Sequence, residues 1–253
     1  MDFLLKPILK TFTGLGDFCT FAARSTWAGI RHPIKLSEFI EFFDSLGVKS
    51  IPVVIAAGFF SGFSISLFLE GELDQYGAKM TLGRVIGVTA IREMGPMVVA
   101  LMLTGRVGAS IAAQLGSMKI GNQVDAIIAL GQDPERKLAA PRIWALTLLC
   151  PMLTVIAILA TLVGGFLAST VGTGMFWYQA QMSMYFRHLT SGLTKPFVFG
   201  WMIAAVSCYF GLRTENGVVG VGKAVSNTVV VCCVFIFVTN ALLGMLMILW
   251  TGF

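Results

Sequence analysis

The sequence is poor in charge and in residues that bind metals. Charged residues make up 12% of the 253 residues, whereas an ordinary soluble domain has about 25%. Together with a mean hydropathy of +0.82, this composition excludes a soluble globular protein and indicates an integral membrane protein. The two histidines, His32 and His188, are far apart, and none of the five cysteines forms a CxxC pair, so we expect no metal site.

Two further features are missing from the sequence. The first residues, MDFLLKPILKTFTGLGDF, lack the short apolar core and small-residue cleavage site of a signal peptide, so none is expected. The net charge of +5 is not clustered into a basic patch of the kind that binds nucleic acid. Its distribution between apolar runs indicates contact with anionic lipid headgroups instead.

Apolar runs predict the fold class, because a helix needs about 20 such residues to cross a bilayer. We predict an all-α integral membrane protein, with interfacial amphipathic helices in residues 1–50 and five transmembrane helices in residues 51–253. Apolar residues at helical spacing in 1–50 can lie in the membrane interface or pack on protein, and both remain open. The five predicted spans are Ile51–Leu69, Val85–Gly105, Ile143–Ala168, Phe197–Leu212 extended back to Leu189, and Ala224–Phe253.

Lysines and arginines in the segments that flank these runs predict the orientation. Thirteen lie before the first run, between the second and third, and between the fourth and fifth. Four lie in the other segments, namely Lys79, Arg84, Arg187 and Lys195. The bias predicts a cytoplasmic N-terminus and, with five spans, a C-terminus on the outer side.

The second run contains Arg92 and Glu93 in the stretch AIREMGP. A charge at mid-membrane costs at least about 2.5–3.5 kcal/mol on insertion scales, and Pro96 removes a backbone hydrogen bond. We infer a segment that faces a polar or water-filled cavity, where both charges contact a charged or zwitterionic group. The alternative is a structural pair that holds neighbouring helices. Glu93 as a general acid or base has no evident partner beyond Arg92, so an intramembrane enzyme is poorly supported.

Two helical patterns in the spans each allow two interpretations. The stripe Ile65, Leu69, Leu73 and Tyr76 continues past the end of the first run. It can line a path for an apolar cargo or pack on another copy of the chain. Small residues at four-residue spacing predict close helix packing, either within one chain or at a dimer interface. These small residues are Gly58, Gly62, Ser66, Gly108, Ala112 and Gly116.

The long segment between the second and third runs predicts a short amphipathic helix. Asn122, Gln123 and Asp125 suit a helix N-terminus, and Gly131 suits its end. Asp133–Pro134 begins the next turn. Such a helix can dock into a partner's groove or lie on the membrane surface.

Two blocks of the sequence resemble one known family. They are REMGPMVVALMLTGRVGASIAAQLGSMKIGNQVDAIIALGQDPERKLAAPR at 92–142 and GVVGVGKAVSNTVVV at 217–231. Both are similar to the MlaE/YrbE permease family of MCE-associated ABC lipid transporters, and the likeness extends in order and spacing over about residues 50–253. The sequence departs from the family pattern at Gly121–Asn122, where the family has Thr-Glu, and at Val225–Ser226, where it has Thr-Thr.

The resemblance implies a homodimeric permease of the bacterial inner membrane that moves phospholipid between the inner and outer membranes. It implies no catalytic residues in this chain, with ATP and magnesium bound by a dimeric cytoplasmic ABC ATPase. It also implies a periplasmic MCE-domain protein and a small cytoplasmic STAS-type subunit. Arg92 and Glu93 would lie at the lipid cavity. A coupling helix around 117–140 would contact the ATPase through Asn122, Gln123, Asp125, Asp133, Pro134 and Arg136.

An energy-independent channel or carrier for an amphipathic small molecule is the alternative function. It differs from the ABC transporter in one respect that can be measured, because it predicts full activity without an ATPase.

Overall fold

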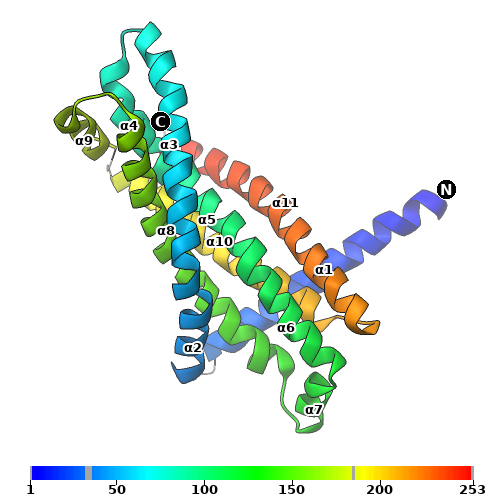
Figure 1. Cartoon of the computed structure of the whole chain (residues 1–253). Helices are drawn as coiled ribbons and strands as arrows, with labels where there is room; N and C mark the ends of the chain where they lie inside the picture. Colours follow the sequence, from blue (N-terminus) through cyan, green and yellow to red (C-terminus); the bar gives the residue numbers. More distant parts are fainter. Residues whose placement is uncertain (1, 32–35, 184–185, 252–253) are drawn as a thin grey trace.

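The computed structural model describes residues 2–31, 36–183 and 186–251, and every element within these ranges is helical (Figure 1). Two helices precede the first long apolar stretch, α1 (Asp2–Arg31) and α2 (Leu36–Leu46). The short helix η1 (Val48–Ser50) leads from α2 into α3 (Ile51–Gln75). Pro52 lies in the first turn of α3, where its missing N–H leaves no helical hydrogen bond unmade.

The second apolar stretch follows the short helix η2 (Lys79–Thr81) and is interrupted twice by π-helical turns. Such turns interrupt α-helices mainly at functional sites. The successive elements are α4 (Leu82–Thr89), the π-turn η3 (Ala90–Met94), α5 (Gly95–Leu103), the π-turn η4 (Thr104–Gly108) and α6 (Ala109–Ile120).

The remainder of the chain adds two more long helices and a long C-terminal helix. Two short helices lie in the connections, one at each end of the bundle (Figure 1). The elements are α7 (Gln123–Ala129), the π-turn η5 (Glu135–Ala139), α8 (Ala140–Ala168), α9 (Thr173–Gln181), α10 (Phe186–Leu212) and α11 (Gly217–Thr251).

Five helical stretches are long and apolar enough to cross a membrane, which confirms the predicted all-α membrane fold. The fourth stretch begins at Gly192, so Lys195 lies within it, as the extension of the predicted span back to Leu189 allowed. The five stretches are Phe42–Gln75, Lys79–Ile120, Glu135–Ala168, Gly192–Leu212 and Gly217–Met247.

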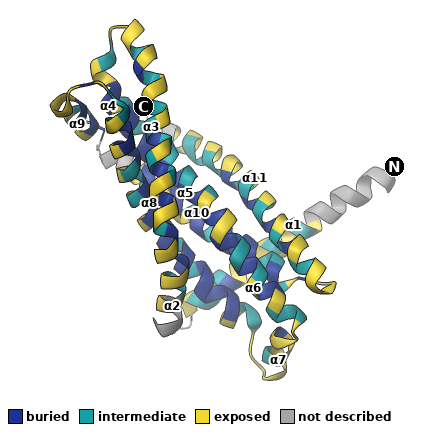
Figure 2. Cartoon of the chain, viewed as in Figure 1, coloured by how far each residue is buried: buried dark blue, intermediate teal, exposed yellow. Residues whose placement is uncertain are grey.

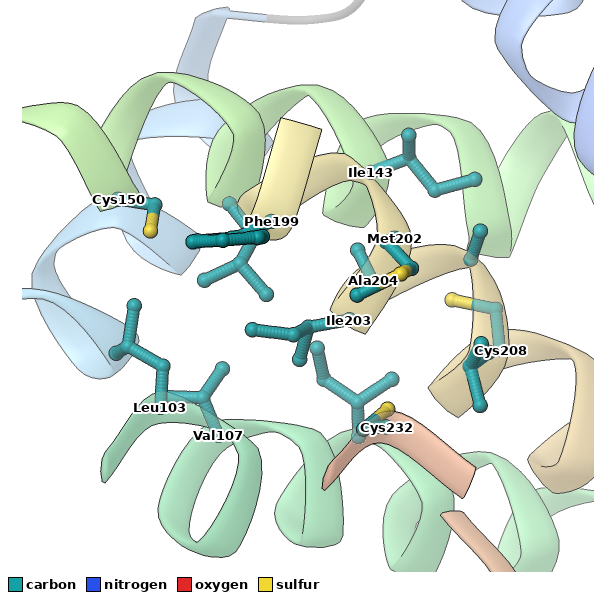
Figure 3. Close-up of a cluster of buried hydrophobic side chains, with 14 of the residues drawn as sticks. Leu103, Val107, Ile143, Cys150, Phe199, Met202, Ile203, Ala204, Cys208 and Cys232 are labelled. Carbon is teal, nitrogen blue, oxygen red and sulfur yellow. The ribbon is translucent and has the colours of Figure 1, made fainter. Parts of the chain in front are cut away.

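The main core lies where α10 packs between α8 and the α5–α6 segment. Phe199 and Ile203 of α10 are fully buried there against Leu103 of α5 and Ile143 of α8 (Figure 3). In the most apolar 18-residue part of the α10 stretch 67% of the residues are buried, whereas in the corresponding part of α11 only 11% are buried. Helix α11 therefore turns a long apolar face away from its own chain (Figure 2).

Small residues bring α3 against α8 within one chain. A Cβ atom at Gly58 would lie 2.8 Å from the carbonyl oxygen of Ala157, and one at Gly62 would overlap the backbone of Thr161. A similar approach places Gly116 of α6 beside Thr214. These glycines serve packing inside the chain, which is the first of the two interpretations that their spacing allowed.

The N-terminal helices pack on the end of the bundle that carries α7 (Figure 1). Phe21 and Ala22 of α1 are buried in the main core, whereas Trp27 and Ile30 are 63% and 62% exposed. Packing on protein therefore accounts for part of the apolar face of α1. The side chains of 2–12 and 36–39, where the two predicted apolar stripes begin, lie outside the described residues.

Candidate functional site

Two contacts fix the depth of Arg92 and Glu93 in the second span. At one end, Lys79 pairs with Glu70 at the end of α3 at 2.9 Å. At the other end, the guanidinium of Arg106 donates to the backbone carbonyl of Lys49, just before α3 begins. Arg92 lies about halfway between these contacts, roughly 20 Å from each at about 1.5 Å of rise per residue. The charged pair therefore lies about halfway between these two contacts, within the apolar stretch Lys79–Ile120.

Pro96 explains the local backbone around this pair. In an α-helix the carbonyl of residue 92 would accept a hydrogen bond from the N–H of residue 96, and proline has none. The π-turn Ala90–Met94 closes instead with a bond from the N–H of Gly95 to the carbonyl of Ala90. The carbonyl of Arg92 is thus left available for a donor from another helix.

Lys195 of α10 supplies that donor. Its ammonium nitrogen lies 2.9 Å from the Arg92 carbonyl oxygen and 2.7 Å from Oε1 of Glu93. The Lys195 side chain is only 1% exposed, so two acceptors are needed to replace the water that it loses. Glu93 therefore has an ion-pair partner that the sequence did not reveal.

Asn240 of α11 completes the cluster. Its amide nitrogen donates to Oε2 of Glu93 at 2.8 Å, so Glu93 is held by α10 and α11 at once. The buried Oδ1 of Asn240 has no hydrogen-bond partner among the described residues. We name Arg92, Glu93, Lys195 and Asn240 the midspan polar cluster.

The midspan polar cluster opens into a cavity of about 560 Å³ beside α11. The Glu93 side chain is 44% exposed toward it, although Lys195 behind it is buried. Apart from Glu93 and Asn240, the lining is apolar. The lining residues are Glu93, Asn240, Ala241, Gly244, Met245 and Leu249.

The charges of the cluster do not all face the cavity. Glu93 and Lys195 neutralise each other, while Arg92 has no acidic partner within 4.0 Å among the described residues. One positive charge is therefore left over in the cluster, but Arg92 is not among the residues that line the cavity, and the charged residue in that lining is Glu93. A guanidinium can bind phosphate or carboxylate, because it offers several donors in a planar fork.

The predicted apolar stripe is not part of this cavity's lining. Leu69 and Leu73 are partly buried against a small second core that includes Leu82 and Phe176. Ile65 is also partly buried, and Tyr76 is 81% exposed at the C-terminal end of α3. The structure thus separates these residues from Arg92 and Glu93, toward the end that carries α9.

The predicted amphipathic helix is present as α7, at the opposite end (Figure 1). Val124 faces the protein at 4% exposure, while Ile128 and Leu130 are 55% and 75% exposed. Gly131 adopts a φ of +72° just after the helix, as expected for a glycine that ends one. The short apolar surface of Ile128 and Leu130 is open for a partner.

The residues that flank α7 shape its two ends. Asn122 precedes the helix with a φ of +57° and makes no side-chain cap, so it does not act as the expected capping residue. The next residue, Gln123, begins the helix and is exposed. Asp125 in the first turn pairs with Lys119 at 2.7 Å.

The turn after α7 is organised by Asp133. Its Oδ1 accepts a hydrogen bond from the N–H of Glu135 at 2.9 Å, across Pro134. Arg136 is exposed in the π-turn that follows. The predicted candidates on this segment therefore lie on α7 and on the two turns that flank it.

The sequence interpretation missed Lys195 and Asn240. Lys195 lies beside Pro196 at the edge of an apolar run, so it resembles the end of a loop. Asn240 is a single uncharged amide in a long apolar helix. The available signal was the need of Glu93 for a partner, because a buried carboxylate at mid-membrane needs a cation or several donors.

Comparison with known proteins agrees with this geometry. The family model described as Permease MlaE matches residues 39–246. A probable ABC transporter permease protein of Rickettsia felis is 34% identical over 243 residues, covering 94% of this chain and 93% of the relative. The intermembrane phospholipid transport system permease protein MlaE of Haemophilus influenzae is 28% identical, covering 89% of this chain and 88% of that protein.

A plant relative extends the comparison. The chloroplastic protein TRIGALACTOSYLDIACYLGLYCEROL 1 of Arabidopsis thaliana is 27% identical over 219 residues, covering 85% of this chain and 63% of that protein. Together with five long apolar spans, these matches identify a multi-pass membrane protein. The chain belongs to the MlaE family of ABC transporter permeases, which are non-catalytic transport subunits that rely on a partner ATPase.

Proposed function

We propose that this chain is the permease of an ABC transporter that moves phospholipid between the inner and outer membranes of a double-membrane bacterium. The observation that carries the proposal is the midspan polar cluster beside an apolar cavity. A phospholipid has a phosphate for the surplus positive charge and acyl chains for the apolar lining. The relative from Haemophilus influenzae, named as an intermembrane phospholipid transport permease, supports the same cargo.

A second copy of the chain would complete the cavity. Helix α11 forms the cavity wall and is mostly exposed, and Met245 and Leu249 are 64% and 71% exposed. Pairing two copies along α11 would cover this apolar surface and enclose the headgroup away from acyl chains of the bilayer. In this arrangement Arg92 and Glu93 bind cargo, and Lys195 and Asn240 position Glu93.

The stripe on α3 would extend the cargo path toward the outer end. Ile65, Leu69 and Leu73 keep partly exposed apolar surface, and Tyr76 is open at the tip. An MCE-domain protein on this side would receive or deliver the acyl chains. The positive charge bias supports an inner-membrane chain with its N-terminus in the cytoplasm and its C-terminus in the periplasm.

The opposite end would bind the ATPase dimer, which holds ATP and magnesium. The exposed Ile128 and Leu130 of α7 provide an apolar anchor, and Asp133, Pro134 and Arg136 provide the rim. We assign residues 1–50 to a cytoplasmic and interfacial region and 51–253 to the permease domain, with the coupling region around 117–140. A small cytoplasmic STAS-type subunit would join the complex on this side.

The test uses the complex of this chain with its ATPase in proteoliposomes that contain a fluorescent phospholipid. Arg92→Gln should reduce ATP-dependent lipid transfer at least about tenfold, since one charge-assisted bond is lost, while the ATPase still co-purifies. Ile128→Asp should instead abolish co-purification of the ATPase. The matched control is Lys223→Gln, which removes an exposed charge outside both surfaces and should leave both measurements unchanged.

The same assay separates the alternative function. An energy-independent channel or carrier would transfer lipid at the full rate without ATP and without the ATPase. That outcome, or unchanged transfer by the Arg92 variant, would overturn the proposal.

A further inference from the structure

A further arginine of the second span, Arg106, is exposed and lies far from the midspan polar cluster. Arg106 belongs to the π-turn Thr104–Gly108, roughly 20 Å along the helix from Arg92. Its guanidinium reaches across to η1 and donates to the backbone carbonyl of Lys49. This contact brings the basic residues Arg106 and Lys49 to the same edge of the bundle.

Both basic residues lack a counter-charge among the residues that the structure describes. Neither has an acidic group within 4.0 Å, although Lys79, Lys119 and Lys195 each have one. Arg106 uses one of its nitrogens for the Lys49 carbonyl, and both side chains are exposed. The guanidinium of Arg106 thus lies beside the backbone of a second uncompensated basic residue, and such a pair can form a site for an anion.

The position of this pair corresponds to the edge of the hydrocarbon layer. The uncharged stretch Ile51–Leu69 of α3 is about 28 Å long at about 1.5 Å per residue, close to the hydrocarbon thickness of a bilayer. Lys49 immediately precedes it. The depth of Arg106 and Lys49 is therefore that of the phospholipid headgroups in the leaflet on the α7 side.

The surface around the pair suits a lipid better than a soluble anion. Val48, Val53 and Met102 are 53%, 44% and 39% exposed, so apolar side chains flank the two cations. Beside Arg106, a Cβ atom built on Gly105 would meet nothing within 4 Å, which leaves the bulge open to its surroundings. An acyl chain can lie along this surface while the headgroup meets the guanidinium.

We propose that Arg106 and Lys49 bind the phosphate of an anionic phospholipid in the leaflet on the α7 side, at a site separate from the cargo cavity. The guanidinium offers paired donors to the phosphate, and Lys49 adds a second positive charge. The midspan polar cluster contains a carboxylate, whereas this pair has none within reach. It therefore selects a headgroup with a net negative charge over a zwitterionic one.

This proposal depends only on the chain being in a membrane and not on the proposed transport function. A lipid bound here would contact the start of α3 and the bulge of the second span together. It would add to the hydrogen bond that joins Arg106 to Lys49 at this depth. The bound lipid would thus stabilise the arrangement of the first two spans.

The test measures lipids retained by the purified full-length chain, using native mass spectrometry after exchange into equal amounts of phosphatidylglycerol and phosphatidylcholine. The unmodified chain should retain phosphatidylglycerol in preference. The double variant Arg106→Gln/Lys49→Gln should lower the ratio of phosphatidylglycerol to phosphatidylcholine about tenfold or more, because charge-assisted bonds to the phosphate are lost. Lys223→Gln removes one exposed positive charge elsewhere and should leave the ratio unchanged.

Two additional variants keep the outcome decisive. Arg106→Lys preserves the charge, so it should fold normally and lower the ratio less than the double variant does. Arg84→Gln removes an exposed positive charge near the opposite end of the second span and should leave the ratio unchanged. An unchanged ratio in the double variant, or an equal fall of the ratio in Arg84→Gln, would overturn the proposal.

Discussion

The pair Glu93–Lys195 allows a direct test of whether the midspan charges serve function or only hold helices together. Glu93→Gln leaves a 1%-exposed ammonium without its counter-charge. Removing one partner of a buried ion pair costs about 3–5 kcal/mol. For a chain of this size we expect the unfolding midpoint in mild detergent to fall by roughly 6–20 °C, at about 2–4 °C per kcal/mol.

The double variant Glu93→Gln/Lys195→Met separates stability from function. It buries no charge and leaves the Arg92 carbonyl without its donor, which costs about 1–3 kcal/mol. Its unfolding midpoint should therefore lie above that of Glu93→Gln, a recovery that a double-mutant cycle measures as coupling. ATP-dependent lipid transfer should stay low in both variants, since the polar cluster is gone. If the double variant recovers transfer together with stability, the pair is structural only and our assignment of Glu93 to cargo binding is refuted.

Two further variants test the packing and the backbone of the spans. Gly62→Ala should reduce accumulation of the chain in the membrane severalfold, because its Cβ would overlap the backbone of α8. The control Gly71→Ala should accumulate normally, because a Cβ at Gly71 would meet nothing within 4 Å. Immunoblots of membranes measure the accumulation of both variants. Pro96→Ala supplies an N–H that competes for the Arg92 carbonyl, so lipid transfer should fall without loss of thermal stability. Normal accumulation of the Gly62 variant, or unchanged transfer by the Pro96 variant, would contradict these two explanations.

Local sequence signals predicted the spans and the C-terminal end of α7. A long apolar run consists of adjacent residues and can be read directly from the sequence. The predicted spans Ile51–Leu69 and Ile143–Ala168 accordingly fall inside the observed spans. Gly131 ends α7 because its positive φ suits glycine, and this preference is also local. The bilayer and the backbone impose these features on neighbouring residues, which is why one sequence is enough to predict them.

The partners of Glu93 could not be predicted in the same way. Lys195 is about a hundred residues away in the chain, and only the packing of α10 beside the π-turn Ala90–Met94 brings it within 2.7 Å. Asn240 depends likewise on how α11 lies against the second span. The sequence contained the requirement for a partner and the break at Pro96, but the identity of the partner is a property of the tertiary structure.

The arrangement of the cluster explains why arginine, glutamate and proline occur together in an apolar span. Pro96 frees the Arg92 carbonyl, and this carbonyl and Glu93 together hold the buried ammonium of Lys195. Since Glu93 is engaged in this way, it does not neutralise the guanidinium of Arg92. Under the proposed function, a phosphate that reaches Arg92 would gain more here than in water, because an unpaired charge at this depth is costly. The proline and the glutamate would then keep the arginine available for the ligand.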